Sequence, residues 1–279
     1  MNAIPQIRLA DGARVPALGL GTWTMGERAS ARADEVAALR AGLDLGMTLV
    51  DTAEMYGEGG AEKIVGEAIR GRRDDVFVVS KVYPHNATAR GTIAACERSL
   101  LRLGIEQLDL YLLHWRGTVP LGQTVRAFER LVADGKIARW GVSNFDTADI
   151  DELLHVEGGT HCAVNQVLYH LDERGVEWSL GPRCRDAGIA LMAYSPLGQG
   201  RLLAKRRLQA LAASAGTSPA ALALAWLLHH KVMVVAQSSS AAHLRGNRGA
   251  TEIVLDNATL TAIDEAFPPP AAKRPLAVL

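Results

Sequence analysis

Four residues of this chain could form an acid–base set. Asp51, Lys81 and His114 each lie at or just beyond the end of a short apolar run, and Tyr56 lies five residues past Asp51. A tyrosine, with an ordinary pKa of about 10, is a poor proton donor near neutral pH. A neighbouring ammonium group favours the phenolate. We therefore expect Lys81 to lower the pKa of Tyr56, Asp51 to hold Lys81, and His114 to donate a hydrogen bond to a substrate oxygen.

The elements that must position these residues are visible as a repeat. Short apolar runs recur roughly every thirty residues, and stretches of helical periodicity separate them. The runs are residues 17–21, 48–50, 76–79, 108–113, 137–142, 162–164, 189–193 and 232–235. Buried strands that alternate with helices form βαβ units and a parallel sheet. Eight units without a linker predict an α/β fold, a closed (β/α)₈ TIM barrel, in a single domain of residues 1–279.

Three further segments flank or interrupt the repeat. Asp11-Gly12 lies between two short apolar stretches, a pattern typical of a β-hairpin, which we expect to cap the bottom of the barrel. Residues 199–215 read as an insertion after the seventh strand, and Ser218-Pro219 as the start of the helix that follows it. The tail after Phe267 begins with three prolines, so it cannot continue a helix.

Polar residues follow the other predicted strands as well. In a barrel of this kind the functional groups lie at the carboxyl ends of the strands. One polar residue at a strand end is commonly solvated or caps a helix. A series of such ends instead predicts a shared site, and its further members are Ser143, Asn144, Asn165, Gln166, Tyr194, Gln237, Ser238, Ser239 and Ser240.

Composition excludes several classes of function. Lys+Arg and Asp+Glu number 30 each and aromatic residues make up 5%, which argues against nucleic-acid binding. The three cysteines show no CxxC spacing, which is typical of free thiols in a reducing compartment. We find no signal peptide, no apolar run long enough for a membrane span and no metal-ligand spacing. These patterns predict a cytoplasmic protein with no membrane or metal partner.

Several motifs, in their order along the chain, resemble the aldo-keto reductases. They are Asp51–Gly57, Lys81-Val82, Leu112–Trp115, Gly141–Phe145, Asn165-Gln166 and Tyr194–Gly198. The similarity extends from about Val15 to Phe267, nearly the whole chain. Within the family the pattern is most similar to the bacterial methylglyoxal reductase branch.

The resemblance implies a barrel that binds NADPH without a Rossmann domain and reduces aldehydes and ketones. It implies that Tyr56 donates the proton, that Lys81 and Asp51 tune it, and that His114 orients the carbonyl. The nicotinamide ring would stack on Tyr194. The implied cofactor contacts are Gly21, Thr22, Trp23, Asp51, Ser143, Asn144, Gln166, Tyr194, Ser195, Leu197, Gln199, Gln237, Ser238, Ser239, Ser240, His243 and Asn247.

One segment departs from the family pattern. After the last strand the family usually reads Ile-Pro-Lys-Ser, with an arginine six residues past the lysine. Here Gln237 replaces the lysine and His243 the arginine. Those two cations would bind the 2′-phosphate of NADPH through charge-assisted hydrogen bonds. We still expect NADPH to be preferred, with NADH as a possible second cofactor.

The substrate pocket is predicted from large apolar residues that follow the first four strands. We expect Trp23, Met25, Met55, Tyr83 and Trp115 to wall a narrow pocket beside His114, suited to small carbonyls such as methylglyoxal.

Two other functions compete with this prediction. The first is a barrel aldolase with Lys81 as a Schiff-base amine. The second is a non-catalytic NADP(H)-binding sensor or regulatory subunit, although a sensor needs no proton donor. We expect a monomer, as is usual in the family.

Overall fold

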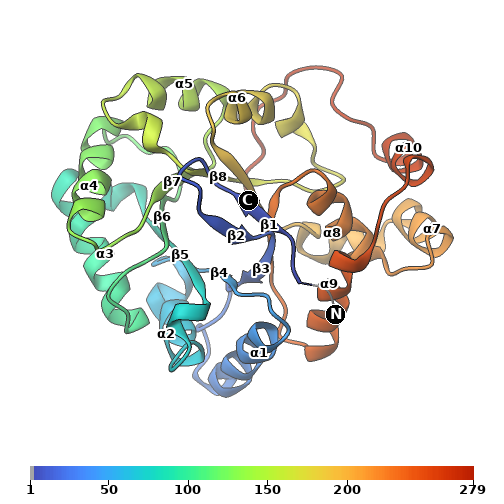
Figure 1. Cartoon of the computed structure of the whole chain (residues 1–279), viewed down its shortest axis with the longest axis horizontal. Coiled ribbons are helices and arrows are strands. Elements are labelled where there is room, and N and C mark those ends of the chain that lie inside the picture. Colours follow the sequence, from blue (N-terminus) through green and yellow to red (C-terminus); the bar gives the residue numbers. More distant parts are fainter. Residues whose placement is uncertain (1–2) are drawn as a thin grey trace.

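A closed barrel of parallel strands, surrounded by a ring of helices, forms the body of the molecule (Figure 1). The computed structural model describes residues 3–279. Around the barrel each strand pairs with the next, and the last closes onto the first. The strands are β3 (Leu18–Gly21), β4 (Leu49–Asp51), β5 (Phe77–Val82), β6 (Leu110–Leu113), β7 (Trp140–Ser143), β8 (Val164–Leu168), β9 (Ala190–Tyr194) and β10 (Met233–Ala236). The predicted barrel fold is confirmed.

Several strands extend beyond the apolar runs into polar residues. Lys81 belongs to β5, where it pairs with Leu112 of β6, and Ser143 of β7 pairs with Gln166 of β8. Backbone hydrogen bonds between strands form whatever the side chain, so the barrel continues through these polar positions. Lys81 and Ser143, which were predicted to follow strands, are therefore among the last paired residues of β5 and β7. Pairing with the neighbouring strand holds them more rigidly than a loop would.

A helix follows each barrel strand on the outside. These helices are α1 (Arg32–Asp44), α2 (Gly60–Ala68), α3 (Ala89–Leu103), α4 (Leu121–Ala133), α5 (Thr147–His155), α6 (Leu180–Asp186), α8 (Pro219–His229) and α9 (Ala241–Gly249). The predicted start of α8 is confirmed, since the Ser218 hydroxyl accepts the Ala221 N–H. In α4 Val132 is 37% exposed, whereas its neighbour Leu131 is buried. Leu131 lies three residues past the buried Phe128, on the same face of the helix.

The predicted hairpin closes one end of the barrel. Strands β1 (Gln6–Arg8) and β2 (Arg14–Pro16) pair antiparallel. Leu9 and Val15 are buried in the cluster that fills the barrel interior. Asp11 accepts a hydrogen bond from Arg139, which immediately precedes β7. The hairpin thus covers the amino ends of the strands and leaves the carboxyl ends open.

Two helices lie outside the ring. The predicted insertion contains α7 (Arg206–Ser214), which packs against α10 (Asn257–Ala266), and both lie on the same side of the barrel (Figure 1). The tail after Phe267 contains neither helix nor strand. Within residues 3–279 no single helix is long and apolar enough to span a membrane; α7 and α8, bent by 81°, pass that test only as a pair.

Candidate active site

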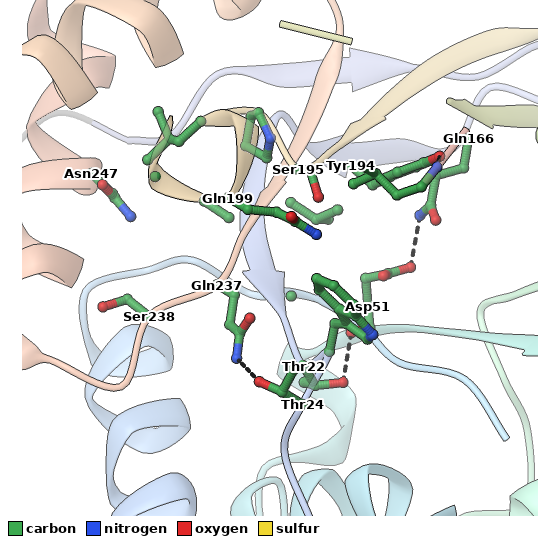
Figure 2. A pocket seen from close by; sticks show the side chains of 18 of the residues that line it. Thr22, Thr24, Asp51, Gln166, Tyr194, Ser195, Gln199, Gln237, Ser238 and Asn247 are labelled. Atoms are coloured by element: carbon green, nitrogen blue, oxygen red, sulfur yellow. Dashed lines mark hydrogen bonds between the residues drawn. The ribbon is translucent and has the colours of Figure 1, made fainter. Parts of the chain in front are cut away.

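A cavity of about 1340 Å³ opens at the carboxyl ends of the strands. Asp51 and Gln166 lie at one end of it, whereas Ser238 and Asn247 lie at the other (Figure 2). The residues of the predicted catalytic and cofactor sets that line it are Gly21, Thr22, Trp23, Asp51, Tyr56, His114, Ser143, Asn144, Gln166, Tyr194, Ser195, Leu197, Gln199, Gln237, Ser238, His243 and Asn247. The barrel thus brings most of the predicted site residues to one space.

Lys81 and Asp51 form a buried ion pair beneath this cavity. Lys81 Nζ lies 2.8 Å from each carboxylate oxygen of Asp51 and donates to the carbonyl of Thr52 at 2.9 Å. The exposed fractions of the two side chains are 0% and 4%. Burial lowers the pKa of Lys81, whereas the charge of Asp51 opposes that shift. The pair is thereby held as an ion pair in a dry environment, where its field is strong.

Tyr56 lies against this pair, on the turn between β4 and α2. Lys81 Nζ lies 3.3 Å from the phenol oxygen of Tyr56 and 4.9 Å from the centre of its ring. Burial and then the negative charge of Asp51 raise the pKa of Tyr56 well above its usual value near 10. The predicted lowering of this pKa by Lys81 is therefore wrong, because desolvation of the phenolate outweighs the ammonium charge. Tyr56 stays protonated, as a proton donor must.

His114 faces Tyr56 from the end of β6. The two ring centres lie 5.8 Å apart, edge to face. Burial and then the charge of Lys81 lower the pKa of His114 well below its usual value near 6.5, so the imidazole is neutral. Nδ1 is buried and has no hydrogen-bond partner among residues 3–279. We assign the ring proton to Nε2, which can then donate into the cavity.

Amide and hydroxyl side chains connect the predicted catalytic residues to the neighbouring strands. Gln166 donates to Asp51 Oδ1 at 2.7 Å (Figure 2). Asn144 donates to the backbone carbonyl of His114 at 3.1 Å, and Tyr194 donates its hydroxyl proton to Asn144 Oδ1 at 2.9 Å. These two bonds link the Tyr194 hydroxyl, through Asn144, to the backbone of His114.

Strained backbone is concentrated around the cavity. Four lining residues other than glycine have positive φ angles: Thr24 (68°), Asn144 (58°), Ser195 (46°) and Gln199 (55°). Such conformations cost about 1–3 kcal/mol each and cluster at ligand sites. Together with the size of the cavity and its amide and hydroxyl donors, they fit an elongated polar ligand such as a nicotinamide dinucleotide.

The far end of the cavity, formed by Gln237, Ser238, His243 and Asn247, contains no lysine or arginine among its lining residues. Gln237 is exposed and donates to the Thr24 hydroxyl at 3.0 Å (Figure 2). Two predicted members of the cofactor site, Ser239 and Ser240, do not line the cavity. Ser240 instead caps α9, where its hydroxyl accepts the His243 N–H. Both serines lie at the start of α9, and their contact with the cofactor stays a prediction.

The structure places only some residues of the predicted substrate wall at the cavity. Trp23, Met55 and Trp115 line the cavity. Tyr83 does not; its ring packs edge to face on Trp115 at 5.5 Å and also contacts His85. Met25 is 2% exposed and belongs to the core. Tyr83 therefore packs on the wall residue Trp115, and Met25 lies in the core.

Several residues that line the cavity were not predicted from the sequence. They are Thr24, Arg116, Pro196, Gly200, Leu203, Ser218, Pro219, Ala220, Val235, Ala236, Ala242, Gly246, Val278 and Leu279. Val278 and Leu279 are the least expected, because they lie at the end of the tail that follows Phe267. The Leu279 N–H lies 3.4 Å from the Tyr194 hydroxyl. No local pattern marks them, whereas Pro196 lies inside a recognised motif and could have been included.

Comparison with known proteins agrees with this geometry. The chain is 50% identical to the methylglyoxal reductase YeaE of Escherichia coli K12, over 97% of each protein. It is 34% identical to the glyoxal reductase of Bacillus subtilis, over 92% of this chain and 91% of that protein. A crystal structure of an aldo-keto reductase from Klebsiella pneumoniae with NADPH covers the whole of both chains at 49% identity and a TM-score of 0.95.

A family model extends this similarity over nearly the whole barrel. The model of the aldo/keto reductase family matches residues 17–267, which run from just before β3 to the end of α10. That range includes Asp51, Tyr56, Lys81 and His114. The chain is therefore an oxidoreductase and belongs to the aldo/keto reductase family.

Proposed function

We propose that this protein reduces small aldehydes and ketones of the methylglyoxal type to alcohols, with NADPH as the preferred cofactor and Tyr56 as the proton donor. The observation that carries the proposal is the buried Lys81, which lies within hydrogen-bonding distance of both Asp51 and Tyr56. The names of the related reductases from Escherichia coli and Bacillus subtilis support the substrate class.

Three side chains carry the proton chemistry. A bound nicotinamide cofactor supplies the hydride to the carbonyl carbon. His114 donates a hydrogen bond from Nε2 and orients the carbonyl oxygen, while Tyr56 gives that oxygen its proton. The phenolate that remains accepts a hydrogen bond from Lys81, whose charge offsets the new negative charge in a dry site. Asp51 keeps Lys81 protonated and in position.

The cofactor would be held along the cavity by residues of several strands. Ser143, Asn144 and Gln166 offer donors and acceptors for a carboxamide, and Tyr194 offers an aromatic face for a flat ring. Backbone near Ser195, Leu197 and Gln199 would meet the diphosphate, and the far end would meet the adenosine. The crystal structure of the Klebsiella pneumoniae relative with NADPH supports a nicotinamide cofactor for this barrel.

At the far end of the cavity, the groups available to bind the 2′-phosphate of NADPH include no lysine or arginine side chain of the cavity lining. Gln237 and His243 take positions where the family usually has cations, so the 2′-phosphate would be bound by amide, hydroxyl and imidazole groups. Such contacts are weaker than charge-assisted ones. We therefore propose a modest preference for NADPH and measurable turnover with NADH.

The two alternatives are less well supported. An aldolase would need Lys81 to attack a carbonyl, yet its amine is fully buried, ion-paired and does not line the cavity. A sensor would not need the assembled donor set of Tyr56, Lys81 and His114.

The test follows absorbance loss of NADPH and of NADH with methylglyoxal. We expect Tyr56→Phe to lower kcat about 10³-fold and to keep the cofactor Kd, because only the proton is removed. Tyr111→Phe is the matched control: it also deletes a buried tyrosine hydroxyl, one that does not line the cavity, and it should leave kcat unchanged. Cofactor binding without turnover in the wild type, across a panel of aldehydes, would contradict the proposal.

A further inference from the structure

A second ion pair, with a buried carboxylate and a guanidinium group that is 18% exposed, lies behind the barrel wall between α2 and α3. Glu62 is fully buried, and Arg102 Nε donates to its Oε2 atom at 2.5 Å. Arg102 also donates to the Ser99 hydroxyl at 3.2 Å. A buried ion pair of this kind is weak evidence of added stability, because desolvation of both charges offsets their attraction. Its position suggests another role.

Glu62 holds the strand that carries Lys81. Its Oε1 atom accepts a hydrogen bond from the Ser80 hydroxyl at 2.6 Å. Ser80 directly precedes Lys81 in β5, and successive side chains of a strand point to opposite faces. Ser80 therefore points outward to Glu62 while Lys81 points inward to Asp51. Glu62 fixes the outer face of β5 at the level of the catalytic ammonium group.

Arg102 lies against the turn that carries Tyr56. A methyl group added at Gly59, three residues past Tyr56, would lie 2.5 Å from Arg102 Cδ and 2.6 Å from its Nε. On another side of the same turn, a methyl group at Gly60 would lie 2.4 Å from the Gly26 carbonyl oxygen. The turn is thus confined between the Arg102 side chain and the backbone of the loop after β3.

We propose that Arg102, held by Glu62, is a positioning residue for the proton donor. The pair contacts both segments whose meeting defines the site: the turn that carries Tyr56 and the strand that carries Lys81. Neither Arg102 nor Glu62 lines the cavity, so the pair acts on the reaction only through the 3.3 Å contact between Tyr56 and Lys81. This inference rests on the proposed function, in which Tyr56 donates the proton.

The experiment compares two ion pairs that lie near opposite ends of β5. Arg102→Gln removes the pair behind the site. Arg73→Gln removes an ion pair at the opposite end of β5, where Arg73 lies 2.7 Å from Asp109 Oδ2. For both variants kcat, KM, the Kd of NADPH and Tm are measured with methylglyoxal at 25 °C.

We expect Arg102→Gln to lower kcat about tenfold, because small displacements of a catalytic group slow the chemical step strongly. The Kd of NADPH should stay within about twofold, since no cofactor contact is touched. Arg73→Gln should lower Tm and leave kcat unchanged. Glu62→Gln, which keeps the shape of the side chain, should also lower kcat. If Arg102→Gln does not fold, Glu62→Gln takes its place as the test.

Unchanged kcat in Arg102→Gln, or in Glu62→Gln where the first variant does not fold, together with a Tm loss like that of Arg73→Gln, would overturn the inference. Tyr56→Phe is measured in the same series. A collapse of kcat in Tyr56→Phe with no change in the pair variants rejects the positioning role alone. Retained activity in Tyr56→Phe rejects the proposed function, and the inference with it.

Discussion

The two ends of the cavity are built in opposite ways. At the reaction end, formed by Asp51, Tyr56, Lys81 and His114, charged groups are buried and satisfy one another without any ligand. At the far end Gln237 and His243 are exposed, and Gln237 has an exposed hydroxyl partner. Buried charges must be paired, whereas exposed neutral groups are solvated. The proposed reaction end is therefore preorganised without a ligand, and we expect the far end to set only affinity and cofactor choice.

Removal of the charge partner at the reaction end tests this contrast most severely. In Asp51→Asn, Lys81 loses the charge that opposes the burial-driven lowering of its pKa. Its pKa falls further, so the amine loses its proton as pH rises. We expect kcat to fall about 10²-fold at pH 8 and less at pH 6, where Lys81 is more protonated.

The measurement is kcat with saturating methylglyoxal and NADPH from pH 6 to 9. The control is Asp109→Asn, which removes the carboxylate paired with Arg73 at the opposite end of the barrel. A loss of activity in Asp51→Asn that is the same at every pH would mean that Asp51 positions Lys81 but does not set its charge.

Addition of charge at the far end should have a smaller effect of a different kind. The double variant Gln237→Lys/His243→Arg supplies two cations where neutral side chains line the cavity. We expect the Kd of NADPH to fall about tenfold, the Kd of NADH to stay within about twofold, and kcat to change little. Fluorescence titration of both cofactors at low and high salt measures this, since screening should reduce the gain.

Gln107→Lys serves as the charge control, because Gln107 is exposed and lies at the amino ends of the strands. A tenfold gain in that variant would show that the effect comes from net charge. An equal gain for NADH in the double variant would show that the cations do not meet the 2′-phosphate.

The smallest expected effect is on stability at low pH. The pKa of folded His114 is well below 6.5, whereas an unfolded histidine has its ordinary value. As pH falls below about 6.5 the unfolded chain binds a proton that the folded chain does not. Stability is therefore lost as pH falls, by up to about 1.4 kcal/mol per pH unit from this group.

Urea unfolding of the wild type and of His114→Gln at pH 7, 6 and 5 measures this difference. The variant lacks the titrating ring, so its free energy of unfolding should fall less steeply over that range. Parallel curves for the two proteins would mean that the imidazole is protonated in the folded state. The reaction end would then be wetter than its burial indicates.

Most of the barrel could be predicted because its signals are local. An apolar run such as the one before His114 indicates a strand from neighbouring residues alone. The carboxyl ends of the strands in a parallel barrel then lie on the same side. The same rule brought Lys81 and Gln166 together although 85 residues separate them. Other features depend on a neighbouring element: Ser240 was expected to bind cofactor, and the structure shows that its hydroxyl caps α9.

The sequence by itself determined the order of strands and helices, the hairpin and the identities of the groups that meet at the mouth, because each depends on residues close together in the chain. Only the tertiary structure decided that the pKa of Tyr56 is raised, that Tyr83 stands behind the wall and that Leu279 reaches Tyr194. Burial and electrostatic fields arise from segments far apart in sequence, and no local pattern records them.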